Sequence, residues 1–334
     1  MAHGEPVKGS LFIYAPNKWA PVIFAVGFAA LGLIHTWQCR HYNCFKTMWL
    51  HLVCCFMFTA GFALRQYGSF NYIDSEDRTN LYFYIGSTCL IYMAPPLLEL
   101  ANYHILGRVL FYVPYHSPMH PGRVLTTFGM LSVVVEVMNA LGVSNISNNR
   151  LPEDRQKLGH ILMKTSLIVQ VAVLLLFCVL AGLFQYRCAK GNIRSKRVSA
   201  PLWTLYASTL LILVRCIYRI IEHFGISSIN PTNAKAEDLS PILRYEWFFY
   251  GFEATLMLIN NLLWSAMHPR RYLPQHRNIY LAQDGVTELE GPGWKDNRSF
   301  LVTLLDPFGW LDSKKDQPPF WEKNGHAKVQ DDHV

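Results

Sequence analysis

The chain has 334 residues, of which 51% are hydrophobic and 14% aromatic, while only 16% carry a charge. This is little charge for a water-soluble protein. The formal net charge of +7 does not indicate a nucleic-acid-binding protein, because the lysines and arginines are spread over connectors and helix ends and do not form one dense stripe. We therefore expect membrane lipids, and no nucleic acid, as partners.

Seven stretches of the chain are uncharged or nearly so, and each is close to the roughly 20 residues that cross a bilayer as a helix. In chain order they are 19–39, 47–64, 79–98, 124–140, 165–186, 198–214 and 247–267. The core of a soluble protein would not explain seven such runs separated by short polar connectors. The sequence predicts an all-α, polytopic integral membrane protein whose residues 19–267 form a seven-transmembrane-helix bundle.

The expected orientation in the membrane follows from the N-terminal segment and from the position of the basic residues. Residues 1–18 lack the apolar core of a signal peptide, and the densest group of basic residues, RCAKGNIRSKR at 187–197, follows the fifth span. We expect an extracellular N-terminus and a cytoplasmic C-terminus, with the plasma membrane as the location. Residues 268–334 are rich in Pro, Asp, Lys and Gly, and we expect them to form a mostly disordered cytoplasmic tail.

The second, third and fourth spans each contain polar residues. The second ends near Arg65, and the fourth contains Glu136 and Asn139. In the third span Glu99 follows the tandem prolines at 95 and 96, which should kink the helix because proline lacks a backbone N–H. Broken helices often mark substrate sites in transporters, although a kink filled by packing is the alternative.

The sixth span continues into a charged helical segment, RCIYRIIEHFG. Arg215, Arg219 and Glu222 are three or four residues apart and therefore share one helix face. An ionised group in hydrocarbon costs from about 3 to well over 10 kcal/mol, so this face should point into the bundle. Arg215 is the deepest of these cations, and we expect Glu253, Glu136 or an anionic group of a ligand as its partner.

The seventh span carries a polar stripe at heptad spacing. Positions 246, 250, 253, 257, 260 and 264 read Glu, Tyr, Glu, Met, Asn and Trp, so Glu246, Glu253 and Asn260 should face inward. With the residues of the other spans, three arginines and four glutamates converge on the outer half of the bundle. They predict either a polar cavity for an amphiphilic molecule or a set of ion pairs that hold the helices together, and the two interpretations are compatible.

The run LVRCIYRIIEHFG and the following YEWFFYGFEATLMLINNLLWSAMHPRRYLP resemble the fungal lipid-translocating exporter family, the RTA-like proteins. Further similar segments are GFALRQYG in the second span and MAPPLLELANYHILGR in the third, and the resemblance covers roughly residues 14–274. This family is associated with resistance to 7-aminocholesterol and with export of sphingoid long-chain bases. The resemblance implies functional positions at Arg215, Tyr218, Arg219, Glu222, Glu246 and His268.

The sequence departs from the family pattern at three places, one of which is the fifth span, where Lys164, Thr165 and Ser166 stand in place of smaller apolar residues. Asn139 follows Glu136 where the family usually pairs Asp with Gln, and the last span ends in HPRR rather than HPG. These changes leave the seven-span architecture intact but affect the ligand preference.

Three classes of function remain. The first is a transporter or exporter of an amphiphilic lipid or toxic small molecule, driven by a gradient because no Walker motif is present. The second is a seven-helix receptor or sensor of amphiphilic ligands without transport. The third is an intramembrane metal hydrolase, which would need three or more ligands at one depth, whereas the histidines are scattered. We favour the first class, and expect no catalytic residue, metal or cofactor.

Overall fold

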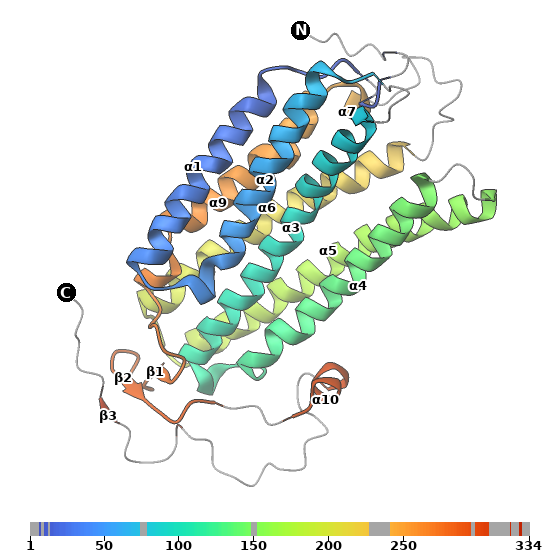
Figure 1. The fold of residues 1–334 in the computed structure, drawn as a ribbon. Helices are drawn as coiled ribbons and strands as arrows, with labels where there is room; N and C mark the ends of the chain where they lie inside the picture. The colour runs from blue at the N-terminus through green and yellow to red at the C-terminus, as the bar shows by residue number, and fades with distance from the viewer. Residues whose placement is uncertain are drawn as a thin grey trace. The chain divides into compact units, whose positions relative to one another are not determined.

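A computed structural model describes residues 7, 10–12, 14–73, 79–147, 152–226, 241–294, 298–306, 321 and 327–328. Most of these residues are helical (Figure 1). They divide into two compact units. Unit 1 contains residues 1–99, 134–172 and 210–265, and unit 2 contains residues 100–133, 173–209 and 266–334.

Six described helices are long and apolar enough to cross a membrane. They are α1 (Ala20–His41), α2 (Phe45–Phe70), α3 (Thr79–Tyr112), α4 (Pro121–Ser147), α5 (Glu153–Lys190) and α6 (Lys196–Ile226). Apart from residue 19, which precedes α1, each of the first six predicted spans lies within one of these helices, so their helical structure is confirmed. The chain is an integral membrane protein.

The seventh predicted span is helical but is not one regular α-helix. After the short α7 (Pro241–Arg244), it consists of α8 (Trp247–Phe249), a π-helix η2 (Tyr250–Thr255) and α9 (Leu256–Ala266). The π-helix interrupts the α-helical hydrogen bonding, so none of the three pieces has the length of a span by itself. The count of seven spans and their orientation remain predictions.

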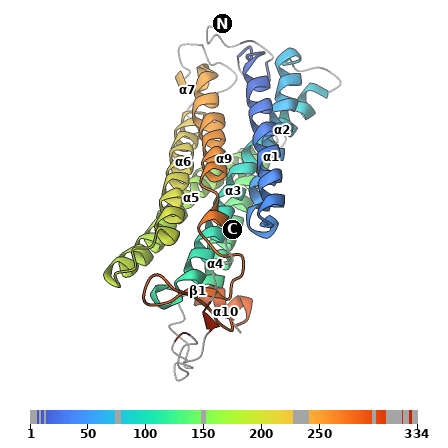
Figure 2. The ribbon, with the colours of Figure 1, turned by 90° about the vertical axis from the view of Figure 1, so that its left-hand side faces the viewer.

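In unit 1, α1 packs against α2, and the two helices lie side by side in Figures 1 and 2. The rings of Phe28 and Phe58 stack with their centroids 4.4 Å apart at this contact. The approach of α2 to α3 requires a glycine, because a Cβ atom at Gly61 would lie 2.7 Å from Cγ1 of Ile91. Small residues allow such close helix contacts in membrane proteins.

The third helix continues through its tandem prolines, Pro95 and Pro96, which lie inside it; of the two interpretations, a broken helix and a kink filled by packing, the unbroken helix favours the second. Neighbouring groups can compensate the backbone near a proline in a membrane helix. Here the thiol of Cys54 on α2 donates a hydrogen bond to the carbonyl oxygen of Ala94, at 3.3 Å.

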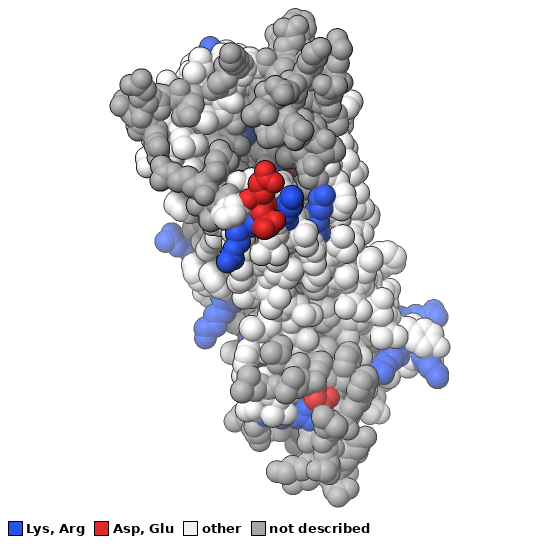
Figure 3. All heavy atoms as spheres, turned by 90° about the vertical axis from the view of Figure 1, so that its right-hand side faces the viewer, with Lys and Arg blue, Asp and Glu red and all other residues white. Residues whose placement is uncertain are grey.

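Large apolar side chains on the spans point away from the helix contacts. Leu33 is 73% exposed and Phe56 is 71% exposed, and residues of this kind occur on all six long helices. In Figure 3, most described residues on the face shown carry no charge. A surface of this composition is suited to lipid rather than water.

Unit 2 contains the described part of the C-terminal tail. Between α3 and α4, unit 2 contains the 3-10 turn η1 (Pro114–His116). In the tail it contains the 3-10 turn η3 (Pro269–Arg271), the strands β1 (Ile279–Leu281), β2 (Glu288–Glu290) and β3 (Ala327–Lys328), and α10 (Phe300–Leu305). The strands form an antiparallel sheet in the order β1-β2-β3, with Tyr280 opposite Leu289.

Side chains from the helices hold the β1-β2 hairpin in place. Glu288 accepts a hydrogen bond from the Tyr112 hydroxyl, at 2.7 Å, and forms an ion pair with Arg197. The Tyr115 hydroxyl donates to the Ala282 carbonyl, at 2.9 Å. Residues 268–294 of the tail are thus placed by contacts distant in sequence, and the expectation of a mostly disordered tail stays a prediction.

Candidate ligand-binding site

All eleven predicted site residues lie in unit 1 and are buried or half-buried. They are Arg65, Glu99, Glu136, Asn139, Arg215, Tyr218, Arg219, Glu222, Glu246, Glu253 and Asn260. The predicted inward stripe of the last span is confirmed, since each of its six positions is at most 9% exposed.

The deepest ion pair joins α6 to the π-helix. Both Nε and Nη2 of Arg215 bind the same oxygen, Oε1 of Glu253, at 2.9 and 2.8 Å. Of the partners expected for Arg215, which were Glu253, Glu136 or an anionic group of a ligand, the structure shows Glu253. Because both bonds go to Oε1, the fully buried Oε2 of Glu253 has no hydrogen-bond partner among the described residues.

The π-helix is a feature that the sequence did not indicate. It places Glu253 within a wide turn of six residues, and the Thr255 hydroxyl donates to the carbonyl of Tyr250, five residues earlier, at 2.8 Å. Single π turns inside α-helices frequently occur at functional sites. The turn changes the direction in which the residues before and after it point.

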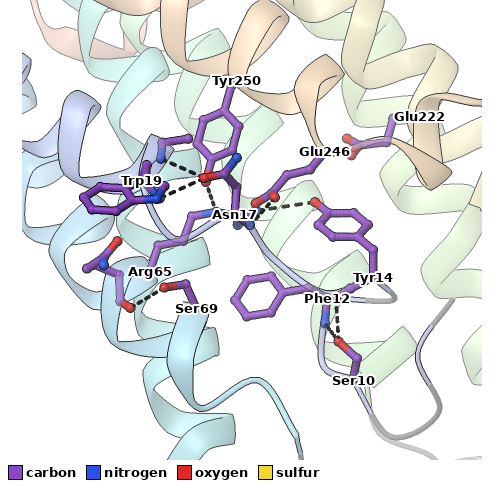
Figure 4. A network of polar contacts seen from close by, with 12 residues as sticks. Ser10, Phe12, Tyr14, Asn17, Trp19, Arg65, Ser69, Glu222, Glu246 and Tyr250 are labelled. Atoms are coloured by element: carbon purple, nitrogen blue, oxygen red, sulfur yellow. Dashed lines mark hydrogen bonds and ion pairs between the residues drawn. The ribbon is translucent and has the colours of Figure 1, made fainter. Parts of the chain in front are cut away.

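A second ion pair joins α2 to the residue that precedes α8. Nη2 of Arg65 lies 3.1 Å from Oε1 of Glu246, and both side chains are less than one-tenth exposed. Arg65 also donates to the hydroxyls of Tyr250, at 3.3 Å, and Tyr14, at 3.4 Å. In Figure 4 the Tyr14 hydroxyl and the Glu246 carboxylate both point toward the guanidinium group.

A third pair, Arg219 with Glu222, lies on one face of α6. The Tyr218 hydroxyl donates to Oε1 of Glu222, at 3.4 Å, and the guanidinium of Arg219 lies over the ring of Tyr92, 3.8 Å from its centroid. The predicted shared face of the sixth helix is therefore present, with a tyrosine of α3 as an additional partner.

The other two glutamates of the site bind amides. Glu99 accepts a hydrogen bond from Nε2 of Gln170 on α5, at 2.6 Å. Glu136 is hydrogen-bonded to Asn139, and its carboxylate is attracted electrostatically by the guanidinium group of Arg215. With three arginines and five glutamates, the site has an excess of carboxylates.

Asn260 differs from the other polar residues of the stripe. Its side chain is completely buried, and neither Oδ1 nor Nδ2 has a hydrogen-bond partner among the described residues. The adjacent Asn261 donates to the carbonyl of Met257, at 2.9 Å. Within the described site, Glu253 and Asn260 thus have buried polar atoms that form no hydrogen bond.

Several partners in this site were absent from the sequence prediction. Gln170 is an uncharged polar residue within an apolar span, a signal that could have identified it. Tyr14 and Tyr92 carry no comparable signal, because tyrosine is common in and near spans. His268, which the resemblance implied, lies in unit 2, where its ring accepts a hydrogen bond from the backbone N–H of Arg270.

The described residues contain no group of three or more His, Cys, Asp and Glu side chains with the geometry to hold a metal ion.

Comparison with known proteins assigns the family. Residues 51–276 match the family described as RTA1 like protein. The chain is 45% identical over 342 residues to a lipid-translocating exporter-like protein RTA1 of Leptosphaeria maculans, an alignment that covers 97% of this chain and 66% of that protein. It is 29% identical over 238 residues to a protein of the same name from Ajellomyces capsulatus, covering 67% of this chain and 70% of the relative.

A third relative, named probable lipid transporter atnI, comes from Emericella nidulans. It is 25% identical over 284 residues, which cover 79% of this chain and 69% of that protein. The chain therefore spans about two thirds of the length of these relatives. No solved structure matches it. Because the family match covers more than half of its residues, the chain belongs to the RTA1-like protein family.

Proposed function

We propose that this protein translocates or exports an amphiphilic lipid or toxic small molecule, of sphingoid-base or sterol type, through a polar cavity within the membrane. The observation that carries the proposal is the unmet hydrogen-bonding capacity of Glu253 and Asn260 inside a site otherwise made of ion pairs. The names of the relatives, two lipid-translocating exporter-like proteins and a probable lipid transporter, support the same class of function.

The energetic argument starts from the cost of such groups. A buried polar atom without a partner costs about 1–3 kcal/mol, and a charged one costs more. Ion pairs that only held helices together would not need an additional free carboxylate oxygen and a free amide. Glu253 and Asn260 lie seven residues apart, about 10 Å along the helix, so polar groups of a ligand that bind at each of them would remove this cost.

The charges of the site indicate the kind of head group. Carboxylates exceed arginines, so a cationic head such as an amine is favoured overall, whereas Arg215 could bind an anionic group next to it. The apolar body of the ligand would lie against the lipid-like surface of the helices. With no Walker motif, the driving force would be a gradient.

The proposal includes a topology. The residues from Trp247 to Ala266 would form the seventh span, since 20 helical residues extend about 30 Å, the thickness of the hydrocarbon core. The N-terminus would be extracellular, the C-terminus cytoplasmic, and the location the plasma membrane. We propose no enzymatic activity.

The test compares three ligands of equal chain length on the purified protein: an octadecyl amine, the alcohol and the carboxylic acid. A ligand that binds only the native state raises its melting temperature, by the equivalent of about 2.7 kcal/mol at 100 times its Kd. We expect the amine to produce the largest shift and a fluorescent long-chain base to cross the membrane of proteoliposomes. Binding without movement would favour a receptor, and no shift with any amphiphile would contradict the proposal.

Two neighbouring asparagines offer a matched control. Asn260→Leu removes an amide without a described partner, so it should preserve or raise the melting temperature while abolishing the ligand-induced shift. Asn261→Leu removes a satisfied amide, so it should lower the melting temperature and leave the ligand-induced shift intact. Equal effects of the two variants would argue against a ligand at Asn260.

A further inference from the structure

The segment that precedes α1 is attached to the ends of α2 and α3 within unit 1. Ser10 forms an isolated antiparallel bridge with Ile73, and the backbone N–H of Leu11 donates to the carbonyl of Tyr72, at 2.9 Å. Residues of this segment other than 13 are described from Ser10 to Asn17. The segment therefore occupies a defined position in the structure.

The ring of Phe12 fills a socket made by α2 and α3. Phe12 is only 6% exposed, and its ring lies 4.7 Å from the Arg65 guanidinium carbon and edge-on to Tyr84, at 4.8 Å. The socket exists because residue 68 is glycine: a Cβ atom there would lie 3.2 Å from Cζ of Phe12. Phe249 covers the guanidinium of Arg65 from another side, at 4.2 Å.

The polar atoms of the same segment complete the Arg65–Glu246 ion pair. The backbone N–H of Asn17 donates to Oε2 of Glu246, at 2.6 Å, and the Tyr14 hydroxyl accepts from Arg65, at 3.4 Å. Figure 4 shows Phe12, Tyr14 and Asn17 grouped around this pair. An apolar ring, a hydroxyl and an N–H donor from one segment thus contact one guanidinium-carboxylate pair.

These are the contacts that an amphiphilic ligand would make with the same residues. We propose that residues 10–17 are a plug, which occupies an access site for the ligand formed by Arg65, Gly68, Tyr84, Glu246 and Phe249. The inference rests on the proposed function. The ligand displaces the plug and reaches Arg65 and Glu246 before it reaches Glu253, which lies seven residues further along the stripe.

Competition between plug and ligand has a measurable consequence. When only a fraction of the molecules has an open access site, the apparent Kd equals the intrinsic Kd divided by that fraction. A variant that weakens the plug should therefore bind ligand more tightly although its fold is less stable. A segment with only a structural role would not produce this combination.

The first experiment uses Phe12→Ala, which removes the ring from the socket. We expect a lower melting temperature without ligand and an apparent Kd for octadecyl amine that is at least threefold lower than in the parent. Phe28→Ala, which removes a buried ring at the α1–α2 contact, is the control and should lower the melting temperature without tightening binding. Unchanged or weaker binding by Phe12→Ala would overturn the plug.

The second experiment holds the plug closed with a disulfide between Ser10→Cys and Ile73→Cys, residues that face each other in the bridge. We expect the oxidised double variant to move a fluorescent long-chain base at least tenfold more slowly than the parent, and reduction to restore the rate. The two single variants control for the substitutions. Transport by the oxidised variant at the parent rate would refute the plug, whereas a parent that neither binds nor moves the lipid would refute the proposed function.

Discussion

Replacement of Arg215 by methionine leaves Glu253 buried without the cation that holds it. Nε of the arginine donates a hydrogen bond to Oε1, Nη2 forms an ion pair with the same oxygen, and Glu253 is completely buried. Removal of one partner from a buried ion pair costs about 3–5 kcal/mol because the other charge is left uncompensated. A factor of ten in the ratio of folded to unfolded protein corresponds to about 1.4 kcal/mol, so this loss reduces that ratio by two to nearly four orders of magnitude.

The assay measures the amount of protein in the membrane and the melting temperature in detergent. Arg215→Met should strongly reduce both, whereas Arg215→Met with Glu253→Leu should recover most of the stability, because no unpaired charge remains. Lys157→Met, at an exposed position of α5, should have no measurable effect. The reasoning is refuted if Arg215→Met is as stable as the parent or if the double variant is as unstable as the single one.

Three further substitutions test other parts of the structure. Gly61→Val should lower the melting temperature by the equivalent of about 1–3 kcal/mol, because its Cβ would lie 2.7 Å from a side-chain carbon of α3; Gly251→Ala, where a Cβ meets nothing within 4 Å, should match the parent. Gln170→Leu should lower the amount of folded protein by removing the 2.6 Å hydrogen bond to Glu99, and unchanged abundance in the membrane would contradict that role. Glu288→Ala should accelerate tryptic cleavage after Arg277, two residues before β1, since it removes the contacts of the β1-β2 hairpin to α3 and α6; cleavage at the parent rate would show that the hairpin does not depend on them.

The first six spans were predictable because each combines a long apolar run with few charges. Their helices are longer than the predicted spans: α5 extends from Glu153 to Lys190, although only residues 165–186 were expected to lie in the bilayer. Hydrogen bonding along a helix continues beyond the apolar run, and hydropathy does not detect this extension. The π turn at 250–255 was not predictable, because π-helical hydrogen bonding leaves no periodic signal in six residues.

How well the polar contacts could be predicted depended on how far apart the two partners lie in the sequence. The shared face of Arg219 and Glu222 follows from helical spacing alone. Estimated depth reduced the protein partners of Arg215 to Glu253 and Glu136 but did not choose between them. The ordered hairpin could not be predicted, because its composition resembles that of a disordered tail and the side chains that hold Glu288 belong to helices more than 90 residues earlier in the chain.

The ion pairs of unit 1 differ in how completely their hydrogen-bonding groups are satisfied. Both oxygens of Glu246 are bound, one to Arg65 and the other to the N–H of Asn17 in the plug. Glu253 has one bound oxygen and one free oxygen, although it is more deeply buried. A set of pairs that served only to hold helices together should be most completely satisfied where water is most thoroughly excluded, because an unmet group is most costly there. Here the most buried carboxylate keeps a free oxygen, whereas the Arg65–Glu246 pair is complete, and this contrast supports the proposal that a ligand head group binds at Glu253.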